Sequence, residues 1–409
     1  MIRNLLRNIV ILLIASVAGF AALMTVSLIP NHLISDHLHD SVETFEREGY
    51  RPEITRYISS KLDNFTDALM LETAAQEIDE NIVNKTLLSY RYVGVQDGKE
   101  LDPVETFIAY YGKKDNIEFK QSTYARYWHG YLVLLKPLLV FLNYFQIRIV
   151  NMIFNIVLTA FVFLKIKSEI NIRTAIMYVL MWVSLMPVVL FCSLQFSSVF
   201  YISTIATIVV LTGKLKKQEN ALCFFLVAGC LTSYFDLLTY PLITLSIPLI
   251  IYLSLYQSDD VKENIKLTLL ISVTWAMGYF GMWVSKWIMA SLLTDKNIIS
   301  STFQQIQMRS SNVVDEQKIS FFAVLAKNLI IFLKNPAPWI GIVYFMYPLF
   351  QEGLHTKKKG IHFSMLIIAA YPFLWYLITM NHSYIHAWFT YRELSISLMA
   401  LGCMVHPTS

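Results

Sequence analysis

Long apolar runs separated by short polar segments fill most of the chain, and several approach the roughly 20 residues that a helix needs to cross a bilayer. The first run covers residues 9–29 and follows the basic start MIRNLLRN. A polar segment of about 100 residues comes next, and apolar runs then continue to the end of the sequence. This pattern predicts an all-α polytopic membrane protein with one polar subdomain inserted after its first span.

We expect about ten transmembrane helices from these runs. They are placed near residues 9–29, 149–164, 175–194, 197–213, 221–234, 240–256, 267–290, 338–351, 361–379 and from 394 onward. The chain then divides into a first transmembrane helix (1–30), an extracytoplasmic loop subdomain (31–147) and a transmembrane bundle (148–409) with an outer loop at 292–336.

Two apolar stretches are predicted to lie on the membrane surface instead of crossing it. The stretch 129–146 carries Lys136 and Pro137 in its middle. A lysine in the hydrocarbon costs about 2.5–3.5 kcal/mol on insertion scales, so we expect an interfacial amphipathic helix that leads into a span starting at Arg148. Residues 320–335 form the second such stretch, and with both on the surface every basic loop falls on one side.

The charges are divided unevenly between these parts. Residues 31–127 hold 18 of the 29 acidic residues but only 11 of the 33 basic ones, so the rest of the chain is basic. Because Lys and Arg collect in cytoplasmic loops, we expect a cytoplasmic N-terminus, an integral plasma-membrane protein and an acidic subdomain on the outer face. Within that subdomain, residues 64–78 have the pattern of an amphipathic helix, so the subdomain should be mainly helical.

Composition supports the membrane assignment. Hydrophobic residues make up 56% of the chain and charged residues 15%, and the mean hydropathy is +0.50. Soluble domains carry about a quarter charged residues. The basic residues cluster at loop ends and not on a soluble face interleaved with aromatics, so we expect a lipid bilayer and no nucleic acid as a partner.

Asp63 and Asp67 are the first candidates for chemistry. They are spaced i,i+4, which places both carboxylates on one face of a helix. Paired carboxylates can bind a divalent cation such as Mg²⁺ or Mn²⁺, or one of them can act as a general base. A solvated acidic helix face is the competing interpretation. Asp36 and Asp40 have the same spacing and remain an alternative pair.

Other unusual residues come from separate parts of the chain, and the topology places all of them at the outer membrane surface. Aspartate in an apolar setting and arginine or lysine near headgroup depth suggest a site for an anionic, lipid-linked ligand. Helix capping, snorkelling and ordinary surface positions are the structural alternatives. The candidate substrate-binding residues are Arg126, Tyr127, His129, Asp236, Lys286, His382, His386 and Arg392.

The layout resembles the GT-C glycosyltransferases, which are polytopic enzymes that use polyprenyl-phosphate sugars. The resemblance rests on the large first outer loop and on YWHGYLVLLKPLLVFLNYFQIRIVNMIFNIVLTAFVFL, an aromatic-His-Pro helix followed by a span that starts with arginine. LDNFTDALML, YARYWHGYLVLLKPLL, YFDLLTYPL and NHSYIHAWFTYRELSISL are also similar to uncharacterised membrane proteins associated with bacterial surface-polysaccharide loci.

The resemblance implies an outer-leaflet glycosyltransferase that moves a sugar from a polyprenyl-phosphate carrier to a surface glycan or lipid-linked acceptor. An acidic residue of the first loop would serve as base or metal ligand, and we favour Asp63 with Asp67. The chain lacks a clear HPPL tetrapeptide and has only Trp128-His129-Gly130. A polysaccharide polymerase and a non-enzymatic flippase for lipid-linked sugars are the alternatives, and an acyltransferase is a further one.

Overall fold

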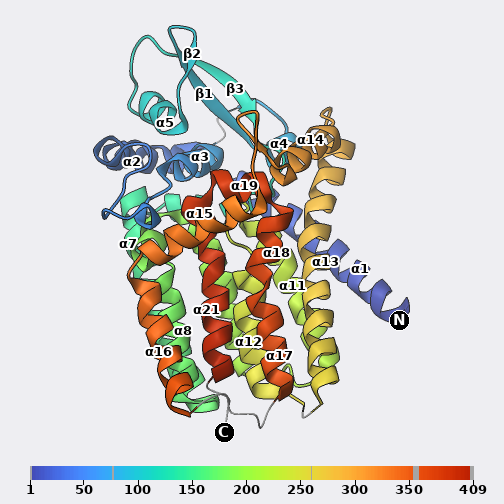
Figure 1. Cartoon of the computed structure of the whole chain (residues 1–409). Coiled ribbons are helices and arrows are strands. Elements are labelled where there is room, and N and C mark those ends of the chain that lie inside the picture. The colour runs from blue at the N-terminus through green and yellow to red at the C-terminus, as the bar shows by residue number, and fades with distance from the viewer. Residues whose placement is uncertain (1, 76–77, 259, 353–358, 406–409) are drawn as a thin grey trace.

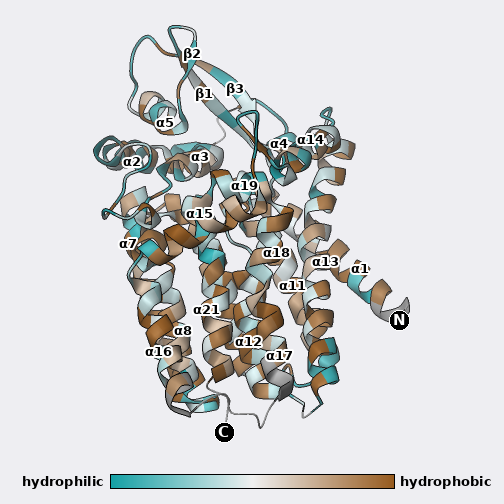
Figure 2. Ribbon diagram, in the orientation of Figure 1, coloured by the Kyte–Doolittle hydropathy of each residue, from teal (hydrophilic) through white to brown (hydrophobic). Residues whose placement is uncertain are grey.

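The computed structural model describes residues 2–75, 78–258, 260–352 and 359–405. It consists of a bundle of apolar helices with a smaller subdomain at one end (Figure 1). The hydrophobic colour of Figure 2 follows the bundle, and the subdomain is mostly hydrophilic. The prediction of a mostly helical chain is therefore confirmed.

The bundle contains one helix from before the subdomain and the helices that follow it. Its members are α1 (Ile2–Ser27), α7 (Tyr144–Glu169), α8 (Ile172–Ser184), α9 (Pro187–Cys192), α10 (Leu194–Leu211), α11 (Gln218–Phe235), α12 (Ile243–Tyr256), α13 (Val261–Leu293), α16 (Ala337–Glu352), α17 (Lys359–Ala369), α18 (Tyr371–Ile378) and α21 (Leu394–Val405).

Four helices in the described part of the chain are long and apolar enough to cross a membrane. They are Leu5–Ser27, Tyr144–Glu169, Leu194–Leu211 and Val261–Leu293, and a fifth span results if α16 and the helix before it, bent by 89°, count as one. Many large apolar side chains on α1, α7 and α13 are exposed, as on helices that face lipid. These features are consistent with association with a membrane.

Glycines allow α11 to pack closely against α13. A Cβ atom at Gly229 would lie 2.1 Å from the carbonyl oxygen of Trp275, and one at Gly278 would lie 2.1 Å from that of Leu226. Small residues of this kind let two helix backbones approach in a membrane. The contact attaches α11, which is not itself among the four long apolar helices, to the long helix α13.

The polar subdomain combines helices with a small sheet. Its elements are η1 (Asn31–Leu33), α2 (Ser35–Glu48), η2 (Ile58–Ser60), α3 (Asn64–Ala75), α4 (Ile82–Leu88), β1 (Tyr90–Gln96), β2 (Lys99–Glu100), α5 (Pro103–Tyr111), β3 (Glu118–Thr123) and α6 (Leu132–Leu139). The antiparallel strand order is β2-β1-β3, with Val93 opposite Lys120.

The expectation of an all-α fold missed this sheet. Strand β1 is rich in tyrosine and valine, which favour strands. The turn after it is Asp97-Gly98, with φ of 51° and 77°. Two successive residues with positive φ are what a two-residue hairpin turn requires.

Both stretches that are predicted to lie on the membrane surface contain a short helix, and the first helix differs from the prediction in its bounds. α6 is eight residues long, and α7 begins at Tyr144, four residues before Arg148. A capping box between Asn143 and Gln146 fixes that start. Lys136 is buried, and its ammonium donates a hydrogen bond to Asn31 Oδ1 at 3.2 Å.

The second, α15 (Phe321–Lys334), meets α16 at 89° and crosses the end of the bundle in Figure 1. The loop before it contains α14 (Ile298–Ser310) and the short strands β4 (Val313–Val314) and β5 (Gln317–Lys318). A chain of short helices leads into α21: α19 (Met380–Ile385), α20 (Ala387–Thr390) and η4 (Tyr391–Glu393).

Candidate functional site

Asp63 and Asp67 lie at the start of α3 and are both buried, with 2% and 0% of their surface exposed. Asp63 caps the helix, since its carboxylate accepts hydrogen bonds from the Thr66 hydroxyl at 2.8 Å and the Thr66 N–H at 3.3 Å. The predicted amphipathic face is wrong, because α3 is buried on nearly all sides. The solvated-acid interpretation of this pair is therefore also wrong.

Asp67 is held by groups from two bundle helices. The Tyr144 hydroxyl donates to Oδ2 at 2.6 Å, and the backbone N–H groups of Leu194 and Gln195 donate at 2.8 and 3.1 Å. Those N–H groups form the N-terminus of α10, where a negative charge is favoured. Burial raises the pKa of Asp67 to about 7, and the positive charge of Arg148 limits the rise.

Asp63 faces a different set of partners. The Gln195 side-chain amide donates to Oδ2, and Arg51 forms an ion pair with Oδ1 at 3.6 Å. The Asp63 N–H donates to the Ser193 hydroxyl at 3.0 Å. Burial raises the pKa of Asp63, while the charge of Arg51 lowers it.

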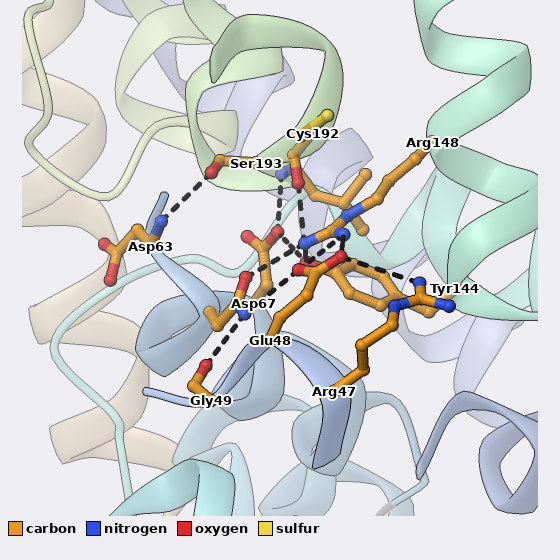
Figure 3. A network of polar contacts seen from close by, with 11 residues as sticks. Arg47, Glu48, Gly49, Asp63, Asp67, Tyr144, Arg148, Cys192 and Ser193 are labelled. Atoms are coloured by element: carbon orange, nitrogen blue, oxygen red, sulfur yellow. Dashed lines mark hydrogen bonds and ion pairs between the residues drawn. The ribbon is translucent and has the colours of Figure 1, made fainter. Parts of the chain in front are cut away.

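Figure 3 shows how Arg148 ties this pair to α2. Its Nη1 donates to both Glu48 oxygens at 2.8 Å, and its Nη2 donates to Asn64 Oδ1 at 2.9 Å and to the Tyr144 hydroxyl at 2.5 Å. The guanidinium is therefore surrounded by Glu48, Asn64 and the Tyr144–Asp67 unit. Arg148 positions α2, α3 and α7 relative to one another.

The donors around the two carboxylates do not fit a divalent cation. A metal ion needs free oxygen lone pairs, but N–H, O–H or guanidinium groups occupy both oxygens of Asp67 and of Asp63. Among the described residues no group of three or more His, Cys, Asp or Glu side chains is placed to hold a metal. The Mg²⁺ or Mn²⁺ hypothesis therefore gains no support from the geometry.

Arg51 connects the acidic pair to α20. Its guanidinium carbon lies 4.6 Å from the ring centroid of Tyr50, 5.0 Å from Phe65 and 5.3 Å from Trp388. Trp388 follows the predicted candidates His382 and His386 in the chain. The structure thus places the polar segment after α1 against the segment that precedes the last helix.

His382 and His386 lie together, with ring centroids 4.7 Å apart. Arg309 of α14 donates to His382 Nδ1 at 2.9 Å, so the other ring nitrogen of His382 donates to Leu238 O at 3.1 Å. Burial, and then the charges of Arg309 and Arg51, lower the pKa of His386 to about 3. Both imidazoles are therefore neutral at physiological pH.

Arg392 is fully buried beneath the loop that carries Arg51. Its Nε donates to Leu185 O at 3.0 Å and its Nη2 to Ser59 O at 3.3 Å, and Phe196 lies 4.6 Å below the guanidinium. Its Nη1 has no hydrogen-bond partner. Among the described residues no carboxylate pairs with this cation.

Asp236 stabilises a turn between α11 and α12. Its carboxylate accepts from the Thr239 N–H at 2.9 Å and from the Thr239 hydroxyl at 2.5 Å. Leu238 within this turn has a φ of 65°, and its carbonyl is the one that binds His382. Asp236 therefore has a satisfied structural role in a turn, and it does not cap α12, which begins only at Ile243.

The remaining candidates form a second cluster around the loop between β3 and α6. His129 contacts Tyr124 O at 2.7 Å and the Tyr131 hydroxyl at 2.8 Å, and burial lowers its pKa to about 3. Tyr127 packs on Trp283 at 5.1 Å between ring centroids. Hydrogen bonds within the described chain do not join this cluster directly to Asp63.

The two cations of this cluster have structural partners. Lys286 is fully buried in α13 and donates to Leu87 O at 2.9 Å and Thr86 O at 3.3 Å, at the C-terminus of α4. Arg126 lies over the Tyr124 ring at 5.6 Å, and its carbonyl accepts from the Trp287 indole. Of the cations chosen from the sequence, neither of these two pairs with the acids.

An apolar groove of about 680 Å³ runs beside the acidic pair. Leu194, which donates its N–H to Asp67, lines the groove, as does Met70 of α3. Other lining residues, Leu134, Phe154 and Ile205, are 60%, 55% and 53% exposed on the outer surface of the bundle. The groove therefore connects an apolar, lipid-type surface with the residues that hold Asp67.

The sequence alone did not identify Arg51, Glu48, Tyr144, Arg148 or Gln195 as site residues. One signal was available, because Tyr144 and Arg148 are polar residues four apart at the start of an apolar run. Arg51 and Gln195 come from distant segments and carried no comparable pattern.

Searches against protein-family models, curated proteins and solved structures each returned no match for this chain. The assignment of a function therefore rests on the residues and their geometry.

Proposed function

We propose that this protein is an outer-leaflet glycosyltransferase that moves a sugar from a polyprenyl-phosphate carrier to a surface glycan or lipid-linked acceptor. One observation carries the proposal. A buried carboxylate pair, Asp63 and Asp67, lies at the end of a helix bundle beside an apolar groove. A site of this kind suits a ligand with a long hydrocarbon tail and a polar, reactive head.

The groove supports the part of this proposal that concerns the lipid tail. Its lining is almost entirely apolar and comes from α6, α7, α10 and α11, with Met70 from α3. Because lipid tails are as apolar as the groove, an isoprenoid chain in it would be held by van der Waals packing against these side chains. Leu194 would then bring the head of the lipid to the N-terminus of α10, next to the acids.

Asp63 is the better general base of the two. Each carboxylate accepts three hydrogen bonds from the protein, so it is access that distinguishes the two. Asp63 is bordered by Arg51, whose side chain is 26% exposed. A ligand can therefore approach Asp63 from the Arg51 side, whereas Asp67 orients Gln195 and the α10 terminus.

In the proposed reaction, the oxygen of an acceptor hydroxyl forms a bond to the anomeric carbon while the bond from that carbon to the phosphate oxygen breaks. The hydroxyl proton passes to the Asp63 carboxylate, and polyprenyl phosphate leaves with the bonding electrons. Attack from the opposite side inverts the anomeric configuration. Arginine near the leaving phosphate stabilises the negative charge that grows on it, and Arg51, Arg309 and Arg392 are the described arginines around this region.

The proposal includes the ten-span topology, with a cytoplasmic N-terminus and the subdomain outside. The three shorter apolar helices and the bent α15–α16 pair would raise the count from four to eight, and α11 and α21 would bring it to ten. A first outer loop with a buried carboxylate and an arginine early in the next span is the layout that the GT-C resemblance implies.

Transfer of radiolabelled sugar from polyprenyl-phosphate donors by purified protein tests the proposal. We expect Asp63→Asn to lower transfer by about 100-fold or more. Asp36→Asn is the matched control, since Asp36 is exposed on α2 of the same subdomain and should retain full activity. A chelator should leave transfer unchanged, because the site does not fit a metal.

Retained transfer in Asp63→Asn would remove the proposed base, and loss in Asp36→Asn would move the base to α2. If no donor is turned over but labelled lipid binds and changes leaflet, the flippase alternative replaces this proposal.

A further inference from the structure

Arg51 is held in an unusual way for an arginine beside a buried acid. Its side chain is 26% exposed, whereas its partner Asp63 is 2% exposed. The 3.6 Å contact from Nε to Oδ1 is an ion pair without a hydrogen bond. Tyr50, Phe65 and Trp388 surround the guanidinium and account for its other contacts.

A comparison with Arg148 shows that the N–H donors of Arg51 are available to a ligand. Arg148 donates four hydrogen bonds to protein oxygens. Arg51 has five N–H donors, and none of them forms a hydrogen bond within the described part of the chain. Aromatic rings bind the faces of a guanidinium and leave its edge, which carries the N–H groups, open to a ligand.

The other charged groups near Asp63 are paired elsewhere, so the charge of Asp63 is balanced by Arg51. Asp67 lies on the same helix, and its charge is balanced from α7 by Arg148, which also balances Glu48 of α2. On the other side, His386 is neutral, and Arg309 is engaged with His382. Among the described residues, Arg51 is the cation that forms an ion pair with Asp63.

We propose that Arg51 exchanges partners when an anionic ligand binds: its guanidinium leaves Asp63, takes up the phosphoryl group of the ligand, and so frees the Asp63 carboxylate to accept a proton. The ligand class is a phosphate ester on an apolar chain. The statement that the accepted proton comes from a sugar acceptor rests on the proposed function, but the exchange itself does not.

Two physical effects favour the exchange. A phosphate offers Arg51 two parallel N–H to oxygen bonds, which are stronger than a single ion pair at 3.6 Å. Once the guanidinium has moved, the buried carboxylate keeps the desolvation that raises its proton affinity and loses the charge that lowered it. Ligand binding would thus convert a paired acid into a base only when the phosphate is in place.

The first test measures binding by isothermal titration calorimetry. Geranyl phosphate is the probe and geraniol its uncharged counterpart. We expect Arg51→Gln to weaken binding of geranyl phosphate about tenfold or more, with a smaller loss in Arg51→Lys, which keeps the charge but not the planar fork. Arg47→Gln is the matched control, because Arg47 lies in the same segment, is 57% exposed and should bind as the wild type does.

The second test counts protons. Titrations in two buffers with different ionisation enthalpies give the number of protons taken up with the ligand. We expect the wild type to take up part of a proton that Asp63→Asn does not, and this difference should also vanish in Arg51→Gln. Titration of the phosphate is removed by comparing proteins that share residue 51, namely the wild type with Asp63→Asn, and Arg51→Gln with the double variant Arg51→Gln/Asp63→Asn.

Each outcome decides between the claims. Binding of geranyl phosphate that Arg51→Gln leaves within twofold, absence of binding to the wild type, or proton uptake that is equal in Asp63→Asn, would each overturn the exchange. Binding and proton uptake as described, without sugar transfer from any donor, would leave the exchange standing and refute the glycosyltransferase. Sugar transfer with an unchanged KM in Arg51→Gln would support the glycosyltransferase and refute the exchange.

Discussion

Replacing Arg148 with methionine should loosen the attachment of the polar subdomain to the bundle. Arg148 lies in the second turn of α7, but its hydrogen bonds reach Glu48 of α2 and Asn64 of α3. Methionine preserves much of the side-chain volume and removes the charge and every donor. The variant therefore isolates the electrostatic part of the contact.

The expected loss of unfolding free energy follows from the buried charge of Glu48, which remains without its partner. Removing one partner of a buried ion pair costs about 3–5 kcal/mol, because the other charge stays buried. Glu48 is 20% exposed, so water can solvate part of it and the lower end applies. Asp67 also loses the positive charge that limits its pKa. We expect the free energy of unfolding to fall by about 3 kcal/mol.

Unfolding of the purified protein in detergent, followed by tryptophan fluorescence, measures this change. Arg47→Met is the matched control, because Arg47 contacts the same Glu48 at 3.9 Å but is 57% exposed, and it should cost less than about 1 kcal/mol. A double-mutant cycle of Arg148→Met with Glu48→Gln should give a coupling free energy of about 2 kcal/mol.

Two results would refute this reasoning. One is a cost for Arg148→Met no larger than that for Arg47→Met. The other is a coupling free energy below about 0.5 kcal/mol, which is the level expected for independent sites. Either would mean that the short distances around Arg148 do not correspond to a contact that stabilises the fold.

Three further predictions concern pH, the groove and Lys286. Burial raises the pKa of Asp67 from 3.8 to about 7. Its contribution to the free energy of unfolding is therefore complete below about pH 4 and is lost as the pH rises to about 7, by at most about 4 kcal/mol. Unfolding curves of Asp67→Asn should lack this dependence on pH. Ser198→Trp places a ring in the groove and should raise KM for long-chain donors while leaving ten-carbon donors unchanged in a transfer assay. Lys286→Met removes a cation that binds only backbone carbonyls and an aromatic ring among the described residues, so it should leave the KM for the donor unchanged.

The apolar runs were sufficient to predict most of the helices, because membrane helices must satisfy their own backbone hydrogen bonds and are therefore continuous and apolar. The sequence was less informative in the polar segment. There a strand such as β1 and a helix such as α3 both mix polar and apolar residues, and α3 is buried on nearly every side, so no period marks its face. The Asp97-Gly98 turn was the local signal that could have revealed the sheet.

The acidic pair was found from its spacing, whereas its partners were not. Gln195 and Arg51 lie in different segments from Asp63, and nothing in their own neighbourhoods distinguishes them. Lys286 shows the opposite case. A lysine near the outer end of an apolar run suggested a phosphate ligand, but the C-terminus of α4 supplies carbonyl acceptors that no pattern within α13 could indicate.

The site exists only where the subdomain meets the bundle. Burying the Asp67 carboxylate without partners would cost several kcal/mol, and its donors are the Tyr144 hydroxyl of α7 and the first N–H groups of α10. Arg51, in turn, needs Trp388 from α20 to complete its aromatic surroundings. Since the subdomain supplies the acids and the bundle supplies the groups that make their burial tolerable, docking of the two parts and formation of the site are the same event. Variants that weaken the Arg148 contact should therefore change the titration of Asp67 even when every residue that contacts Asp67 from α10 is intact.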